Sequence, residues 1–363
     1  MINVLYLFLW AVTLVSVRAE ERLETEDLPN HLSLLDVYAS QNSHVSSGWS
    51  VPAKGFSWHE SGRVARTTNK VSDFFSKYVQ LDDIAMGKVQ LAKNLLISSS
   101  SMQGSIFVKQ ASVNPGAPVY AVPQFFSSPK VTMTAQMDSL STTFDVTYLR
   151  QTGWALITDM DDTLRDADVL NKAQLVRKAA LPPVAVKGMP ELLQHLYQIT
   201  AGDLPTFYVS QSPAQFYPQK FKSFVNKDLL PGEFFLSNLT ASEWVDTSIS
   251  ADALIEYKTK AINAIQYRFP HRQFILLGDS GQSDPETYGD AYRNYGPNVV
   301  KCIYIRLVEG QNAQKEAEKN TEARFLEAFK NIPAQSWYVF KDPSELMSIT
   351  AAQMQRNMCR PQR

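Results

Sequence analysis

The sequence predicts an α/β fold, in which a Rossmann-like parallel sheet carries helices on both faces and follows a smaller β-rich N-terminal domain. Two observations predict it. From about residue 151, apolar runs of strand length alternate with stretches of helical spacing, as in a parallel sheet covered on both faces. Before residue 150 the chain is rich in Ser, Thr, Val and Gln and shows the alternation of half-buried strands.

Composition sets the broad class of protein. The 363 residues are enough for two domains of ordinary size. The chain is 44% hydrophobic and 20% charged, and its net charge is −1, so we expect no nucleic-acid partner. The sequence gives no indication of the oligomeric state.

The chain begins with a nearly unbroken apolar run over 4–15, and the small Ala19 follows it. This pattern is typical of a secretory signal peptide, so we expect residues 1–19 to be cleaved and the protein to be secreted. An uncleaved signal anchor is the alternative.

Residues 20–150 form the expected β-rich accessory domain. Alternating stretches over 105–113, 130–137 and 143–149 predict strands, and the spacing over 81–96 predicts a helix. This half contains no recognisable cluster of chemically active side chains.

Residues 151–345 form the expected catalytic domain. Strands are predicted at 154–158, 206–210, 273–279 and 302–306, and helices at 190–199, 256–269 and 285–295.

The C-terminal part begins with a charged stretch over 311–331, which predicts one solvent-facing helix. A last strand and helix are expected within 336–349. Residues 346–363 are expected to form a helix and tail, with the basic end frayed.

Each predicted core strand ends in a polar residue: Asp159, Ser210, Asp279 and Arg306. In open α/β sheets, ligands bind beyond the carboxyl ends of the strands. These four endings therefore predict one shared site.

The first of these endings reads D-x-D-x-T, with Asp159, Asp161 and Thr163. One carboxylate can attack phosphorus, and the other can protonate the leaving oxygen and later activate water. Two carboxylates this close resist joint ionisation unless a cation neutralises them, and Mg²⁺ prefers such oxygen ligands. The alternative is an acidic loop at the start of a helix.

The stretch GDSGQSD supplies Asp279 as a metal ligand and Asp284 as its support. Gly278 and Gly281 would permit a tight turn between them. The alternative is an ordinary Asp/Gly turn.

Two further residue types would suit a phosphate. Ser210 and the backbone beside it, at Gln211, could donate to phosphate oxygens, although a Ser/Pro turn is the alternative. Lys258 could neutralise charge on a transferring phosphoryl group, but spacing alone does not distinguish it from Lys260.

Cys302 and Cys359 are the two cysteines of the chain. In the secretory pathway they could form a disulfide that ties the C-terminal tail to a core strand. Two unrelated thiols are the alternative. Residues 238–240 form the one N-glycosylation sequon.

The ordered set of motifs resembles the haloacid-dehalogenase-like (HAD-like) phosphohydrolases. More narrowly, the chain is similar to the catalytic domain of the fungal actin-patch phosphatidate phosphatases and their bacterial relatives, over about 151–310. The strings that carry the resemblance are ITDMDDTL, YVSQSPAQFYP, YKTKAI, RFPHRQFILLGDSGQSDPETY and IYIRLV. The N-terminal region is similar only around GWSVPAKGFSW.

The resemblance implies a role for each matching position. Asp159 would be the nucleophile that becomes an aspartyl-phosphate, Asp161 the general acid and base, and Lys258 the stabilising cation. Thr163 would hold the loop, and it would bind substrate with Ser210 and Gln211. The implied Mg²⁺ ligands are Asp159, Asp161 through its carbonyl, Asp279 and Asp284.

The expected function is therefore that of a secreted Mg²⁺-dependent phosphatase. The resemblance implies phosphatidate or a related phospholipid as the substrate. The short segment over 165–205 leaves room only for a small cap, which favours an open site that could accept a large substrate or a lipid headgroup. One alternative is a phosphatase of soluble phosphoesters or phosphoproteins. Another is a catalytically silent binding protein on the same fold.

Overall fold

The structure is a computed structural model that describes residues 31–41, 49–51, 55–58, 96–99, 105–107, 120–122, 130–137, 140–213, 216, 220–237 and 251–361. Several expectations lie outside these residues. They are the signal peptide, the helix over 81–96 apart from its last residue, residues 108–113 of the strand expected over 105–113, and the sequon.

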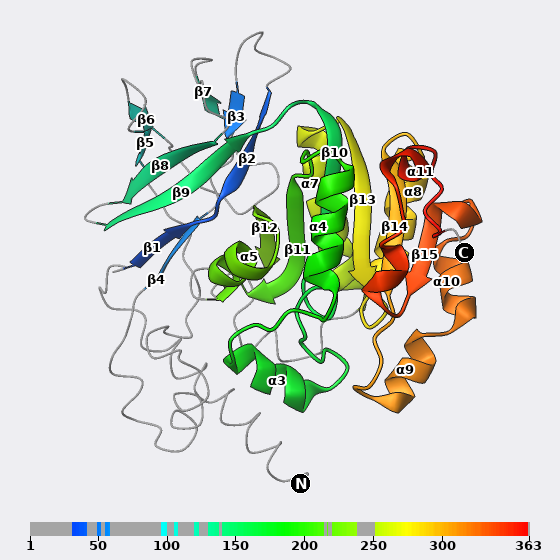
Figure 1. The fold of residues 1–363 in the computed structure, drawn as a ribbon. Helices are drawn as coiled ribbons and strands as arrows, with labels where there is room; N and C mark the ends of the chain where they lie inside the picture. Colours follow the sequence, from blue (N-terminus) through cyan, green and yellow to red (C-terminus); the bar gives the residue numbers. More distant parts are fainter. Residues whose placement is uncertain are drawn as a thin grey trace, which may run out of the picture.

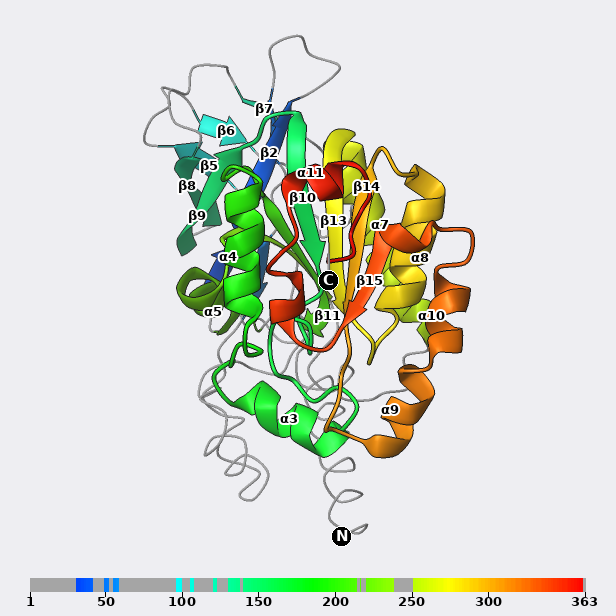
Figure 2. The same ribbon diagram turned by 45° about the vertical axis from the view of Figure 1, so that its right-hand side comes forward.

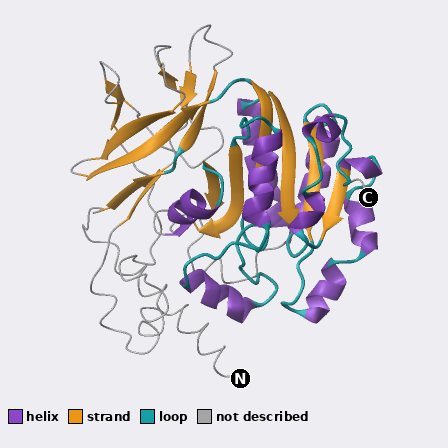
Figure 3. Cartoon of the chain, viewed as in Figure 1, coloured by secondary structure: helices purple, strands orange, loops and turns teal. Residues whose placement is uncertain are grey.

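A six-stranded sheet forms the centre of the larger part of the molecule (Figures 1 and 3). Its order is β12-β11-β10-β13-β14-β15 and every neighbouring pair is parallel. The strands are β10 (Thr152–Thr158), β11 (Thr206–Pro213), β12 (Gly232–Ser237), β13 (His271–Asp279), β14 (Val300–Arg306) and β15 (Trp337–Phe340). Counted along the chain, the order is 3-2-1-4-5-6, which is that of a Rossmann-like sheet. The predicted fold class is confirmed.

Helices cover both faces of this sheet (Figures 1 and 2). One face packs against α4 (Met189–Ile199), α5 (Lys222–Asp228) and α11 (Ala351–Gln355), and the other against α7 (Ala251–Arg268), α8 (Asp284–Tyr295) and α10 (Glu322–Ala328). Successive side chains of β10 alternate between the two cores: Leu156 enters the first, and Ala155 and Ile157 enter the second. Burial on both faces explains why the strand reads as a continuous apolar run.

Two short helices lie beyond the carboxyl ends of the strands. They are α3 (Lys172–Ala180) and α9 (Ala313–Lys319). Figures 1 and 2 both place them at the end of the sheet toward which the strand arrows point.

The predicted strands coincide with β10, β11, β13 and β14, and the predicted helices with α4, α7 and α8. The single helix expected over 311–331 is wrong, because α9 and α10 are separate. Asn320 is the C-cap of α9, and the Thr321 side chain caps α10 by accepting a hydrogen bond from the Arg324 N–H. Adjacent capping residues end one helix and start the next.

The N-terminal part is a smaller β region, as predicted. Its larger sheet has the order β6-β5-β8-β9-β2-β3-β7. The strands are β2 (Val37–Gln41), β3 (Trp49–Val51), β5 (Leu96–Ser99), β6 (Ser105–Phe107), β7 (Tyr120–Val122), β8 (Lys130–Met137) and β9 (Leu140–Tyr148). A separate pair joins β1 (His31–Leu34) to β4 (Gly55–Trp58). Leu96, the last residue of the expected N-terminal helix, lies in a strand.

Polar contacts join β2 to the α/β part of the molecule. The Tyr38 N–H donates to Glu233 Oε2 at 2.9 Å, and the Tyr38 carbonyl accepts from Arg268. Arg268 also binds both carboxylate oxygens of the fully buried Glu233, at 2.7 and 2.9 Å. The N-terminal sheet is therefore joined to the α/β part by backbone hydrogen bonds of Tyr38 to the Glu233–Arg268 ion pair.

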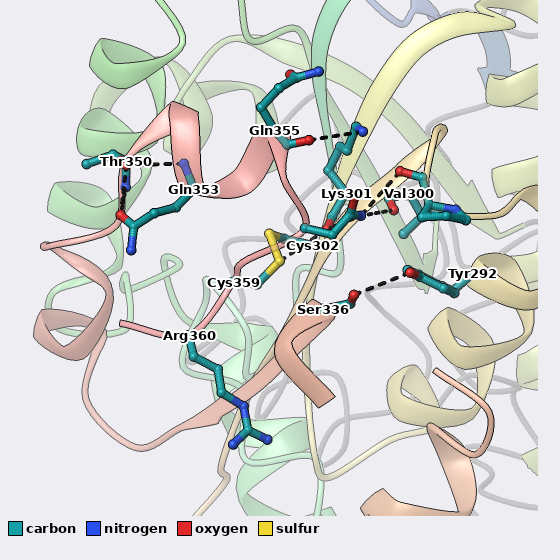
Figure 4. Close-up of a disulfide and its surroundings, with 12 residues drawn as sticks. Tyr292, Val300, Lys301, Cys302, Ser336, Thr350, Gln353, Gln355, Cys359 and Arg360 are labelled. Carbon is teal, nitrogen blue, oxygen red and sulfur yellow. Dashed lines mark hydrogen bonds between the residues drawn. A yellow bond between two sulfur atoms is a disulfide. The ribbon is translucent and has the colours of Figure 1, made fainter. Parts of the chain in front are cut away.

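The C-terminal residues pack against the sheet, so the expected frayed end is wrong. After β15 come η4 (Pro343–Leu346) and α11, and the fully buried Cys359 forms the expected disulfide with Cys302 of β14 (Figure 4). Among the described residues, no helix is long and apolar enough to cross a bilayer.

Candidate active site

The site lies where the strand order reverses. The neighbouring strands β10 and β13 are followed in the chain by β11 on one side and β14 on the other. Asp159 follows β10 directly, Asp279 ends β13, and Ser210 lies in β11. This reversal is the usual ligand site of a doubly wound sheet. The predicted convergence of strand ends is observed.

Three buried carboxylates and one buried ammonium form the centre of the site. Asp159, Asp279 and Asp284 each offer an oxygen within 4.8 Å of the others. The Lys258 Nζ lies 2.9 Å from Asp159 Oδ1 and also pairs with Asp284. All four side chains are at most 2% exposed. Spacing alone did not separate Lys258 from Lys260, but the structure does, because Lys260 is exposed and pairs with Glu256.

Burial and excess negative charge perturb these groups. Burial, together with the Asp284 and Asp161 carboxylates, outweighs Lys258 and raises the pKa of Asp159 to about 8. The pKa of Asp279 is raised for the same reasons, with burial the largest cause. Burial opposes the charge on Lys258, yet the surrounding carboxylates raise its pKa. Such a cluster favours any added cation.

The donor set fits a divalent metal ion. With every group ionised, three carboxylates face one ammonium, so two negative charges are in excess. Asp159 Oδ2 is buried and has no hydrogen-bond partner among the described residues. Hard oxygen donors of this kind suit Mg²⁺. Asp159, Asp279 and Asp284 could hold the ion, as expected from the sequence.

The Asp161 side chain has its own set of partners. Its Oδ1 accepts from the Arg165 Nε at 2.7 Å and from the Nη2 of the same guanidinium, and its Oδ2 accepts from the Ser212 hydroxyl at 2.6 Å. The Ser210 hydroxyl lies 3.5 Å from the same oxygen. The second carboxylate of the motif is thus paired with its own cation.

Sequence reasoning missed Arg165 and Ser212. Arg165 is 1% exposed, and its guanidinium lies 5.3 Å from the Phe221 ring centroid. In the part of the chain that the structure describes, its Nη1 has no hydrogen-bond partner. The available signal was the spacing of four residues between Asp161 and Arg165. Because most Arg side chains next to an Asp are solvated, this spacing gave no reason to expect burial.

The loop after β10 is held by its own acidic residue. Asp162 has a positive φ of 59°, and its carboxylate accepts from the backbone N–H groups of Ala167, Asp168 and Val169 at 2.7–2.9 Å. Asp is among the few residue types that tolerate this conformation. Arg306, the polar end of β14, donates to the Asp162 carbonyl at 2.6 Å. The fourth strand end therefore supports the loop.

Thr163 connects the two halves of the site. Its hydroxyl donates to Asp279 Oδ2 at 3.2 Å. Asp279 Oδ1 also accepts from the N–H groups of Gly281 and Gln282, at 2.7 and 3.2 Å. These bonds fix the orientation of the Asp279 carboxylate.

Gly278 is required for a different reason from the tight turn that we expected. Neither Gly278 nor Gly281 has a positive φ. A Cβ on Gly278 would lie 2.5 Å from Asp284 Oδ2. That carboxylate oxygen accepts from the Asp279 N–H at 3.0 Å. The missing side chain is what allows Asp284 to reach the cluster.

The end of β11 carries the predicted phosphate-binding segment. The pairing of β11 with β12 is irregular between Val209 and Pro213, and such irregularities often re-aim side chains beside active sites. The Ser210 hydroxyl accepts from the Ser212 N–H at 3.1 Å. Gln211 lies beside it, and its carbonyl accepts from the Ser237 hydroxyl at 2.6 Å.

Comparison with known proteins identifies the type of domain. Residues 154–307 match the model of the family described as phosphatidate phosphatase APP1, catalytic domain. The match supports the resemblance found from the motifs. The matched segment contains every residue named above in the carboxylate cluster.

Two curated relatives match a little under half of the chain. Phosphatidate phosphatase APP1 of Saccharomyces cerevisiae is 31% identical over 173 residues, which are 47% of this chain and 28% of the relative. An uncharacterized protein of Schizosaccharomyces pombe is 25% identical over 170 residues, 45% of this chain and 27% of the relative. The chain thus spans less than a third of either relative. A solved structure of a carbohydrate acetylesterase from Xanthomonas citri is 10% identical in sequence, and the match covers 67% of this chain and 69% of the esterase chain. Its TM-score of 0.25 is too low to indicate a shared fold.

Proposed function

We propose that the chain is a Mg²⁺-dependent phosphatase that forms an aspartyl-phosphate on Asp159 and acts on phosphatidate or a related phospholipid. The observation that carries the proposal is the buried cluster of Asp159, Asp279 and Asp284 around Lys258 at the strand reversal. The name of the yeast relative and the family match support the substrate class.

In the first step, a carboxylate oxygen of Asp159 attacks phosphorus. The new acyl-phosphate bond forms as the ester P–O bond breaks, and a proton from Asp161 goes to the leaving oxygen. Lys258 lies beside Asp159 and stabilises charge on the phosphoryl oxygens. A bound Mg²⁺ would neutralise the carboxylates and the phosphoryl oxygens together.

In the second step, the Asp161 carboxylate takes a proton from water. The resulting hydroxide attacks phosphorus, releases inorganic phosphate and restores the Asp159 carboxylate. The observed contacts of Asp161 with Arg165 and Ser212 suit its ionised form.

Ser210 and Gln211 are proposed to bind the phosphoryl group, with Thr163 holding the loop. The Ser210 hydroxyl lies near the Asp161 carboxylate, so a phosphoryl group there would be within reach of the acid and base. The short crossover with α3 is the part of the chain that would determine access.

Phosphate release from phosphatidate in detergent micelles tests the proposal. We expect release that requires Mg²⁺, stops with chelator, and falls at least about 10³-fold in Asp159→Asn. Lys260→Gln, which changes an exposed lysine of the same site-forming helix, is the matched control. Activity on soluble phosphoesters alone would move the substrate to that class. No activity on any phosphoester would favour a binding protein on this fold.

We also propose that the protein enters the secretory pathway. The apolar N-terminus supports this, and so does the Cys302–Cys359 disulfide, because disulfides persist mainly in oxidising compartments. Expression of the whole chain in cultured eukaryotic cells, followed by N-terminal sequencing of protein from the medium, tests it. Retention of the intact N-terminus inside the cell would contradict it.

A further inference from the structure

The segment from α3 to the loop before α4 differs from the rest of the chain in charge. Residues 172–187 contain four Lys or Arg residues and no Asp or Glu, although the whole chain has a net charge of −1. One of the four, Lys178, is neutralised by Asp166 and Asp168, at 2.6 and 2.7 Å. The exposed Lys172 and Arg177 form no ion pair with any described residue.

Two exposed apolar side chains follow these cations. Leu181 is 36% exposed and Val184 is 64% exposed, with the exposed Pro182 between them. Exposed cations beside exposed apolar side chains are the usual composition of a surface that binds a bilayer at the level of the lipid headgroups. We define Lys172, Arg177, Leu181 and Val184 as the docking patch.

The docking patch is attached to the catalytic loop. The Asp166 N–H donates to the Val184 carbonyl at 2.9 Å, and the Val186 N–H donates to the Leu164 carbonyl at 2.8 Å. These bonds flank Arg165, which binds Asp161. Together with the Lys178 ion pairs, they place the patch at the carboxyl end of the sheet, next to the site (Figure 2).

We infer that the docking patch holds the enzyme on an anionic lipid bilayer, so that the site faces the headgroups. The inference rests on the proposed function, because it supplies the surface from which a phospholipid substrate would be taken. The cations complement the negative headgroups, and Leu181 and Val184 enter the headgroup layer. Such a surface explains how a site with only a small crossover segment over it can select a membrane-embedded substrate.

Co-sedimentation with vesicles tests the inference. The full chain is mixed with vesicles of phosphatidylcholine alone or with added phosphatidylserine, which is anionic but is not a phosphomonoester. We expect binding to be at least about tenfold tighter with phosphatidylserine, and this difference to shrink in high salt. The neutral vesicles account for any binding through the apolar N-terminus.

A pair of matched variants locates the binding. Arg177→Glu with Val184→Ser changes the docking patch. Lys260→Glu with Tyr267→Ser makes equivalent changes at exposed positions of α7. We expect the patch variant to lose the preference for phosphatidylserine by about tenfold and the control to keep it. Equal binding by both variants, or no preference in the wild type, would overturn the inference.

Activity separates this inference from the proposed function. The patch variant should hydrolyse soluble p-nitrophenyl phosphate like the wild type, and should be slower only on phosphatidate in vesicles. If no ester is hydrolysed but the binding difference persists, the proposed function fails and the docking surface stands. If the wild type hydrolyses phosphatidate in vesicles and the patch variant does so at the same rate, the docking surface is not used and the inference fails.

Discussion

At the scale of single residues, buried cations gather on one side of the site. Lys220 is 8% exposed, and its ammonium donates to the Ala179 carbonyl and lies 5.5 Å from the Phe216 ring centroid. Burial, with a smaller contribution from Arg165, lowers the pKa of Lys220 to about 8. Lys220 forms no ion pair with any described carboxylate, so its positive charge opposes folding.

The first prediction concerns Lys220→Met. Below pH 8 Lys220 is charged in both the folded and the unfolded chain. Burying this charge raises the free energy of the folded state by about 3 kcal/mol relative to a solvent-exposed lysine. The hydrogen bond of the ammonium to Ala179 recovers roughly 1 kcal/mol of stability, which the variant would lose. We expect the variant to be about 1–2 kcal/mol more stable than the wild type at pH 7. From pH 8 to about 10.5 the unfolded wild-type chain binds more protons than the folded chain, so wild-type stability rises and the gap closes.

Urea denaturation of both proteins across this pH range measures the gap. Comparing the two proteins removes the contribution of other groups that titrate at high pH. A gap that stays constant from pH 7 to 10.5 would contradict the lowered pKa of Lys220.

The second prediction concerns Arg165. Arg165→Met removes the cation that orients Asp161, and small displacements of a reacting group can cost about 10²-fold in rate. We expect kcat to fall by about that factor, with a smaller change in KM, and Arg165→Lys to recover part of the loss. The control is Arg293→Met, which removes a partly exposed arginine that pairs with Asp290. Equal kcat for both methionine variants would exclude a positioning role for Arg165.

Arg165 also shows where prediction from the sequence ends. The motif residues Asp159 and Asp279 were predicted because each directly follows or ends an apolar strand whose direction fixes where the side chain lies. Arg165 follows no such strand. Its burial depends on the bond to Asp161 and on Phe221, which is 56 residues away in the chain, and no local pattern specifies that contact.

At the scale of elements, strands with an unbroken apolar sequence could be predicted, and a strand whose apolar sequence is interrupted by other residues could not. β10 and β13 read as continuous apolar runs because helices cover both faces. The edge strand β12 was missed, although its residues are mostly buried, because Gly232 and Glu233 interrupt its pattern. The disulfide remained one of two alternatives, because the pairing of thiols depends on a distance that spacing does not give.

The third prediction concerns that disulfide. Cys302 and Cys359 are separated by 57 positions in sequence, so the bond closes a long loop of the unfolded chain. Replacing both with Ala should lower the free energy of unfolding by about 2–4 kcal/mol. Denaturation of the double variant, and of the wild type with a reductant, gives two independent measurements. Equal stability of the oxidised wild type and the double variant would contradict the prediction.

At the scale of the whole molecule, one ion pair of the α/β part also binds the N-terminal sheet. Glu233 lies in the edge strand of the catalytic sheet and Arg268 ends α7, while Tyr38 comes from the N-terminal region. The edge strand is therefore covered by β2 and does not offer its whole length to another chain. No sequence pattern predicted this contact, because its partners are about 195 and 230 positions apart.

The fourth prediction tests the connection. Arg268→Met leaves the carboxylate of Glu233 buried without its cation, which should cost about 3–5 kcal/mol. We expect faster amide hydrogen exchange in β2 and a lower unfolding midpoint. Lys260→Met, an exposed change on the same helix, is the control. Unchanged exchange in β2 would show that other contacts hold the two sheets together.

The hydrogen bond from Thr163 to Asp279 joins residues 116 positions apart. Long-range contacts of this kind form late in folding, after local helices and hairpins. During refolding, circular dichroism should therefore recover before phosphate release does. Catalytic turnover is thus the stricter criterion of native structure for any preparation of this protein, and a sample judged by its helix content alone can still lack a complete site.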